Sequence, residues 1–191
     1  MCVPVSLDYM KGGEDVPGPR ATTALGFDIG LLCTACVKVR GEEAISFHLL
    51  NRPTSKKLKL ELLQDELLEW AAGPEIRGAL VGVDCVCIEK HYAGMRPTHT
   101  QMKLRTLEFT LRQYFREKGF KVRMVWAATY KKHFRVCAKN HAENKKIAKR
   151  VAELHVLNPK DHPKIADRIH DLGDAYMVAL YGTGGILRWK E

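Results

Sequence analysis

The stretch Ala24-Leu25-Gly26-Phe27-Asp28-Ile29-Gly30 places one carboxylate near the middle of an apolar, strand-like run that a glycine closes. A buried carboxylate is unfavourable unless it is paired or bound to a metal ion. Asp28 is therefore either a turn residue that caps a backbone N–H or a functional acid, and this stretch alone does not favour either. The decision depends on whether other acidic side chains can meet Asp28 in the fold.

Strand-like segments continue directly after this stretch. The first predicted strand covers 24–31, and apolar residues recur over 33–39 and 44–50 with short turns between them, which favours an antiparallel meander. The spacing then becomes helical over 56–72, and Gly73-Pro74 ends this helix. The remaining predicted elements are a strand over 79–88, a helix over 100–118, a strand over 121–126, a basic helical segment over 127–156 and a last helix over 165–181. The order βββαβαβ followed by helices indicates one α/β domain.

Length and composition set broad limits. The 191 residues can form one domain with a real core, and we assign residues 1–22 to a flexible leader and 23–191 to the folded domain. The net charge of +9 and the pI near 9.3 predict a polyanionic partner, nucleic acid first and an anionic membrane surface second. No hydrophobic run is long enough to span a bilayer and no signal-peptide core is present, so we expect an intracellular protein.

Four of the six cysteines lie in strand-like runs. Cys33 and Cys36 have the C-x-x-C spacing of a zinc ligand pair, but no second pair and no paired histidines follow at zinc spacing. Cys85 and Cys87 alternate within another apolar run. We interpret all four as small buried side chains in a protein that is kept in a reducing compartment.

Acidic residues recur where chemistry is expected. Glu89 follows the apolar part of the fourth predicted strand, and functional groups of open α/β sheets gather at such strand ends. Asp167, Asp171 and Asp174 have spacings of four and three residues, which predicts that they share one face of the last helix. One explanation is a solvated acidic face, and the other is a divalent cation that relieves their repulsion. Hard oxygen ligands of this kind suit Mg²⁺ or Mn²⁺.

The chain resembles a known family in the placement of these acids. The βββαβαβ order, with Asp28 on the first strand and Glu89 ending the fourth, is similar to the RNase H-like fold. The stretch Asp171-Leu172-Gly173-Asp174-Ala175 resembles the RuvC-type Holliday-junction resolvases. Ile88-Glu89-Lys90, the long helix after it and Asn144-Lys145-Lys146 are most similar to the poxvirus-type resolvases. The resemblance implies an α/β fold with a five-stranded mixed sheet in the order 3-2-1-4-5, flanked by helices.

This resemblance covers about residues 22–182 and implies an activity. The implied protein is a homodimer that binds four-way and other branched DNA, and each subunit nicks one of two symmetry-related strands. Metal-dependent hydrolysis would leave 5′-phosphate and 3′-hydroxyl ends, in DNA recombination or in viral concatemer resolution, the latter in the host-cell cytoplasm. Two Mg²⁺ ions per site, replaceable by Mn²⁺, would activate a water and stabilise the leaving oxygen. The implied catalytic metal ligands are Asp28, Glu89, Asp171 and Asp174, with Asp167 as a competitor of Asp171.

A basic segment precedes the last predicted helix. Its lysines and arginines could form a solvated face, but we favour phosphate contact because the segment lies directly before the acids in the sequence. A lysine near the scissile phosphate would also stabilise developing charge. Lys145 and Lys146 are the candidates, because the family has basic residues in this region, and Lys145 is the predicted catalytic lysine. The predicted DNA-binding residues are Arg96, Lys131, Lys132, Arg135, Lys145, Lys146, Lys149 and Arg150.

Several alternatives stay open at the level of sequence. His91 could hold a water, although a lone histidine in a loop is more often a surface residue. Arg96 and its loop could touch DNA near the cut or simply cover the strand end. The apolar face of the predicted helix over 100–118 could form the dimer interface or belong to the core. Two functions compete with junction resolution, an RNase H-like nuclease for RNA–DNA hybrids and a nucleic-acid binder without catalysis.

Overall fold

A computed structural model describes residues 21–52, 59–91, 96–138, 140–157 and 162–189 of the chain. The strands are β1 (Thr23–Ile29), β2 (Cys33–Arg40), β3 (Glu43–Asn51), β4 (Cys85–Lys90) and β5 (Val122–Trp126). The helices are α1 (Leu60–Ala72), α2 (Pro74–Leu80), α3 (His99–Glu117), α4 (Ala127–His133), α5 (His141–His155), the 3₁₀ helix η3 (Pro163–Arg168) and α6 (Ile169–Thr183). Residues 1–20 of the predicted leader lie outside the described residues. No helix in the described part of the chain is both long and apolar enough to cross a membrane.

The five strands form one mixed sheet in the order β3-β2-β1-β4-β5, which confirms the predicted order. β1 pairs antiparallel with β2, and β2 pairs antiparallel with β3, so the predicted meander is present. β1 pairs parallel with β4, and β4 pairs parallel with β5. The first strand is therefore the central one, and its carboxyl end lies beside the carboxyl end of β4.

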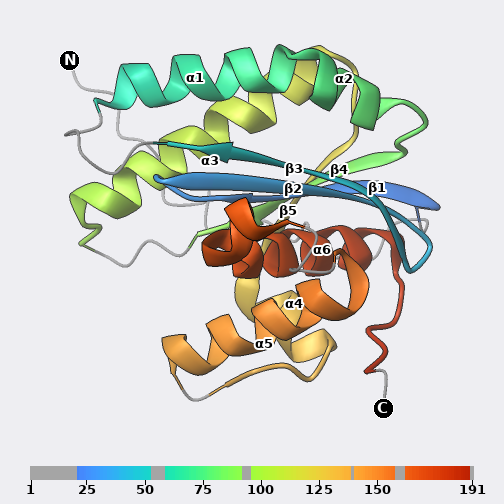
Figure 1. The fold of residues 1–191 in the computed structure, drawn as a ribbon. Coiled ribbons are helices and arrows are strands. Elements are labelled where there is room, and N and C mark those ends of the chain that lie inside the picture. Colours follow the sequence, from blue (N-terminus) through green and yellow to red (C-terminus); the bar gives the residue numbers. More distant parts are fainter. Residues whose placement is uncertain (1–20, 53–58, 92–95, 139, 158–161, 190–191) are drawn as a thin grey trace.

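Helices cover both faces of the sheet (Figure 1). Helices α1, α2 and α3 lie on one face, and α6 lies directly on the other, with α4 and α5 outside it. Side chains alternate across β1, so Leu25, Phe27 and Ile29 are buried toward α1 and α3, whereas Ala24 is buried toward α6. This alternation sends the side chain of Asp28 to the α6 face of the sheet.

Gly26 lets α6 cross β1 at close range. A Cβ atom at this position would lie 2.3 Å from the Ala175 carbonyl oxygen and 2.5 Å from the Ala179 backbone nitrogen. Glycine in a strand interior is otherwise unfavourable, because it loses more backbone conformational entropy on folding than other residues do and has no side chain to pack. The close approach that it permits brings the amino-terminal half of α6 over the carboxyl end of β1, where the acidic residues are.

The predicted strand over 79–88 is wrong in its first half. Ala79 and Leu80 belong to α2, whose first turn begins with a proline, the residue best suited to that position. Gly82, at a φ of 68°, follows in the turn. Asp84 then lies just before β4, and its carboxylate accepts hydrogen bonds from Thr22 and from the backbone of Thr23. These hydrogen bonds anchor the start of β1. The apolar run over 79–88 therefore combines the end of a helix with the start of a strand.

The carboxyl-terminal helices are shorter than predicted. The segment over 127–156 is two helices, α4 and α5, and Arg135 at a φ of 57° lies in the turn between them. The last predicted helix begins as the 3₁₀ helix η3, and α6 starts only at Ile169. This break changes which acids share a helix face, because spacings of three and four align side chains only within one continuous α-helix.

The cysteines agree with their interpretation as buried thiols. Cys33, Cys36, Cys85 and Cys87 are all buried and free. Cys36 is buried toward α1 and α3, and side chains three residues apart on a strand point to opposite faces, so Cys33 points toward α6. The C-x-x-C pair therefore cannot hold one zinc ion.

Candidate metal centre

Two acidic side chains meet at the carboxyl ends of the parallel strands β1 and β4. The register pairs Phe27 with Ile88, so Asp28 and Glu89 follow on neighbouring strands. Cys87 is buried on the α6 face, and Glu89, two residues further, projects to the same face as Asp28. Carboxylate oxygens of Asp28 and Glu89 lie within 4.8 Å of each other. The alternation of both strands thus brings two acids together on one face of the sheet.

Helix α6 adds two more acids. Asp171 and Asp174 are three residues apart in its first turns. Their charges both contribute to the raised pKa of Asp28. Asp167, by contrast, is exposed in η3, one element earlier. The prediction that all three aspartates share a helix face is wrong, because the chain is a 3₁₀ helix at Asp167.

Helix α4 contributes a tyrosine and a lysine to these acids. The Tyr130 hydroxyl lies 3.1 Å from Glu89 Oε2 and 2.9 Å from Asp174 Oδ1, and its ring is fully buried. Lys131 Nζ lies 3.1 Å from Asp174 Oδ1. A phenol has one proton to donate, so it cannot donate fully to both carboxylates. Lys131 is the lysine in direct contact with these acids, and the neighbouring His91 and His170 are cationic only when protonated. With neutral histidines, the cluster of Asp28, Glu89, Asp171 and Asp174, hereafter the acid cluster, carries excess negative charge.

The pKa shifts express this excess. Burial, followed by the charges of Glu89, Asp174 and Asp171, raises the pKa of Asp28 well above its ordinary value. Burial and the charge of Asp174 raise the pKa of Glu89 to about 7. Burial favours neutral Lys131, but Asp174 and Glu89 prevail and raise its pKa. Asp28 and Glu89 thus resist ionisation although Lys131 is close. A divalent cation bound between them would offset the repulsion and favour their ionised forms.

The predicted basic residues divide into one at the cluster and seven on the surface. Lys131, with 18% of its side chain exposed, contacts Asp174 directly. Lys145 and Lys146 are exposed on α5, so the lysine that contacts an acid is not the one predicted as catalytic. The difference arises because α4 begins directly at the end of β5, whereas α5 packs on the outside of α6. The other exposed candidates are Arg96, Lys132, Arg135, Lys149 and Arg150.

Three residues at the site were not among the predicted functional set. The only signal of Tyr130 in the sequence is its position next to Lys131. His91 was considered as a water-holding residue or a surface residue, and one of its ring nitrogens lies within 4.8 Å of Asp28 and Glu89 carboxylate oxygens. Glu108 is buried in α3 and contacts His91. Its signal in the sequence is an acid between Leu107 and Leu111 on the apolar face of the predicted helix.

Cys33 also borders the acid cluster. Burial and the neighbouring carboxylate of Asp171, with which the thiol makes a hydrogen bond, raise the pKa of Cys33. His170 Nε2 lies 3.1 Å from Asp171 Oδ1. Asp171 thus has two described neighbours that orient its carboxylate, a thiol from β2 and an imidazole from its own helix.

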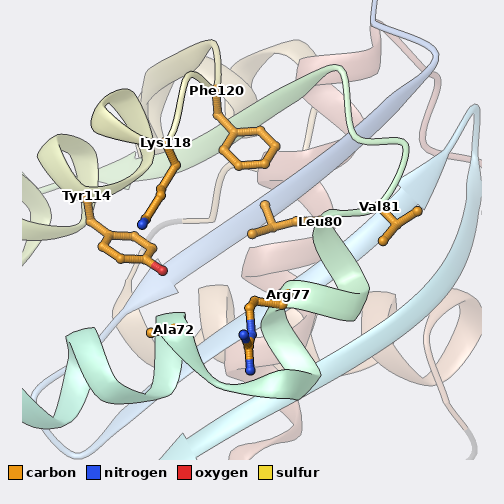
Figure 2. Close-up of a pocket in the computed structure, with 7 residues that line it drawn as sticks. All are labelled: Ala72, Arg77, Leu80, Val81, Tyr114, Lys118 and Phe120. Atoms are coloured by element: carbon orange, nitrogen blue, oxygen red, sulfur yellow. The ribbon is translucent and has the colours of Figure 1, made fainter.

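A cavity of about 490 Å³ lies elsewhere, on the α1–α3 face of the sheet (Figure 2). Its lining residues are Ala72, Arg77, Leu80, Val81, Tyr114, Lys118 and Phe120. These residues provide apolar walls and two cations but no carboxylate, so the cavity offers none of the ligands that a hard divalent ion requires. The chemistry of a metal centre is available at the acid cluster instead.

Comparison with known proteins supports the fold assignment. No protein-family model matches the sequence, and no curated protein matches it. Among solved structures, RuvC of T. thermophilus in complex with a Holliday junction substrate is similar, with a TM-score of 0.55 and 14% identity over 83% of this chain and 90% of that chain. A second structure of Thermus thermophilus RuvC has a TM-score of 0.52 and 15% identity over 83% of this chain and 91% of that chain. The chain therefore has the RNase H-like α/β fold of RuvC.

Proposed function

We propose that the protein is a structure-selective DNA endonuclease that resolves four-way junctions by metal-dependent phosphodiester hydrolysis. The observation that carries this proposal is the meeting of Asp28 and Glu89 from parallel strands with Asp171 and Asp174 from α6. The RuvC-like fold, with one neighbour solved on a Holliday junction substrate, supports the choice of substrate. The net charge of +9 supports a polyanionic partner.

The acid cluster fits a divalent cation by the chemistry of its donors. Carboxylate oxygens are the ligands that Mg²⁺ and Mn²⁺ prefer, and the raised pKa values of Asp28 and Glu89 reflect their burial and the repulsion between neighbouring carboxylates. Asp28, Glu89, Asp171 and Asp174 would hold two ions. When bound, such ions activate a water and stabilise the leaving oxygen of a phosphodiester.

Residues of α4 position the cluster. Lys131 pairs with Asp174 and places a positive charge where the scissile phosphate would approach. Tyr130 holds the carboxylates of Glu89 and Asp174 at a fixed separation, because its hydroxyl lies within hydrogen-bonding distance of both. The exposed lysines of α5, such as Lys145 and Lys149, would contact phosphates further along the DNA arms.

The homodimer would form through α3. The predicted apolar face of the long helix is core, because Leu107, Leu111 and Phe115 are fully buried against the sheet. A different face of α3 exposes Met102 and Phe109, which are seven residues apart and therefore aligned. Exposed apolar side chains of this size mark a contact surface, and two such subunits would cut symmetry-related strands.

A cleavage assay tests the proposal. Wild-type protein with Mg²⁺ or Mn²⁺ should nick synthetic four-way junctions at paired positions to give ligatable ends, and should leave an RNA–DNA hybrid of the same sequence intact. Asp28→Asn and Asp174→Asn should remove cleavage and retain junction binding. Preferential cleavage of the hybrid would show that the substrate is an RNA–DNA hybrid and not a four-way junction. Binding of junctions without cleavage under any divalent ion would indicate a binding protein.

A salt titration tests the DNA contacts of α5. Replacing Lys145 and Lys149 by glutamine should weaken junction binding and reduce the slope of log affinity against log salt by about one per lysine lost. An unchanged slope would show that α5 does not contact phosphate.

A further inference from the structure

We infer that His91 is a nitrogen ligand of the metal centre and that the buried carboxylate of Glu108 positions it. His91 follows the last residue of β4 and lies beside the acid cluster. One ring nitrogen and one oxygen each from Asp28 and Glu89 lie within 4.8 Å of one another. Three atoms at this separation can share one ion. The inference rests on the proposed function, since it adds a ligand to the same site.

Glu108 determines the orientation of the imidazole. Its Oε1 accepts a hydrogen bond of 2.8 Å from the His91 backbone N–H and lies 2.6 Å from the ring Nδ1. A carboxylate accepts, so Nδ1 carries the proton and Nε2 is the nitrogen left for a metal. Metal-bound histidines characteristically have this arrangement, in which a carboxylate holds the far nitrogen.

Glu108 is a buried acid in the middle of α3. Only 5% of Glu108 is exposed, and it lies between the fully buried Leu107 and Leu111 on the sheet-facing side of α3. An acid in such a position is unfavourable for a helix that could bury leucine there instead. Glu108 Oε1 is hydrogen-bonded to His91 twice, through the backbone N–H and through ring Nδ1. Helix α3 thus holds a single histidine at the end of β4.

An imidazole changes which ion the site prefers. Mg²⁺ takes oxygen ligands and retains water, whereas Mn²⁺, which also prefers carboxylate oxygens, accepts an imidazole nitrogen more readily than Mg²⁺ does. A centre with Asp28, Glu89 and His91 therefore favours Mn²⁺ over Mg²⁺ more strongly than four carboxylates alone would. The histidine acts here as a specificity-determining ligand.

Pulsed electron paramagnetic resonance of the Mn²⁺-loaded full chain tests the inference. The wild-type protein should show coupling of Mn²⁺ to a ¹⁴N nucleus, and His91→Gln should lose it. His170→Gln is the matched control, because His170 contacts Asp171 but is not grouped with the Asp28 and Glu89 oxygens as His91 is, and it should retain the coupling. Glu108→Gln should weaken Mn²⁺ binding by about tenfold through loss of the orienting carboxylate.

The outcomes separate this inference from the proposed function. Mn²⁺ bound without ¹⁴N coupling, coupling that persists in His91→Gln, or absence of Mn²⁺ binding would each overturn the role of His91. Junction cleavage by the wild-type protein with Mg²⁺ is measured separately, so its failure concerns the proposed function alone. Circular dichroism of each variant establishes that it is folded before its spectrum is compared.

Discussion

Glu89→Gln is expected to stabilise the metal-free protein while it removes a ligand of the proposed metal centre. Glu89 is 8% exposed, and burial with the charge of Asp174 raises its pKa from 4.5 to about 7. A raised carboxyl pKa means that the folded protein binds this proton more tightly than the unfolded chain does. Stability from this group is therefore present at low pH and is lost as the pH rises from about 4.5 through about 7.

The magnitude follows from the same two pKa values. At about 1.4 kcal/mol per pKa unit, ionised Glu89 destabilises the folded state by about 3 kcal/mol once the pH is well above 7. Glutamine cannot ionise, and its carbonyl can still accept a hydrogen bond from Tyr130. We expect its free energy of unfolding to exceed that of the wild type by about 3 kcal/mol at pH 8 and by about 1 kcal/mol or less at pH 5.

Urea unfolding in EDTA at both pH values measures this difference. Glu69→Gln, at an exposed position of α1, is the matched control and should change stability by less than about 0.5 kcal/mol. Mn²⁺ at a thousandfold excess over its dissociation constant should reverse the ranking at pH 8, because it stabilises the wild type by about 4.1 kcal/mol, which exceeds the gain expected for the variant. An equal gain at pH 5 and pH 8, or a loss of stability at pH 8, would refute the electrostatic argument.

Three further predictions concern Lys131, Gly26 and the ionisation of Glu89. Lys131→Gln should lower junction cleavage by about a hundredfold. Lys132→Gln is the control and should have little effect, because Lys132 is exposed one position further along α4. Equal losses in the two variants would contradict a specific role for Lys131. Gly26→Ala should lower the free energy of unfolding, measured by urea titration, by about 1–3 kcal/mol, because the added Cβ clashes with α6. Gly78→Ala is the control and should be neutral or stabilising, because no atom lies within 4 Å of its added Cβ. Calorimetric Mn²⁺ affinity should rise between pH 6 and pH 8, because Glu89 must lose its proton to bind a cation, and a flat profile would contradict that ionisation.

The order of elements was predictable because its signals are local. Alternating apolar residues and short turns define β1, β2 and β3, and the fourth strand was found although its start was misplaced. The break between α2 and β4 was missed because Leu80 and Val86 are equally apolar, and periodicity cannot separate a buried helix end from a buried strand in so short a run.

The four acids of the cluster were identified from their positions, but their neighbours were not. Asp28 and Glu89 are conspicuous because a carboxylate is unusual beside a buried strand. Lys131 carries no mark in the sequence that separates it from Lys132 or Lys145, since all three lie in one basic segment. Distance to Asp174 decides among them, and that distance depends on how α4 leaves β5 and packs near α6.

The sequence by itself determined the order of the strands, the net positive charge and the acids that make a metal centre possible, because periodicity, composition and residue type are properties of the chain. Only the tertiary structure decided which partners those acids have. The 3₁₀ start of the last helix separated Asp167 from Asp171, and the packing of α3 joined Glu108 to His91. Such contacts join residues far apart in the chain, and the through-space electrostatics that shift the pKa of Asp28 exist only once β1, β4 and α6 are packed together.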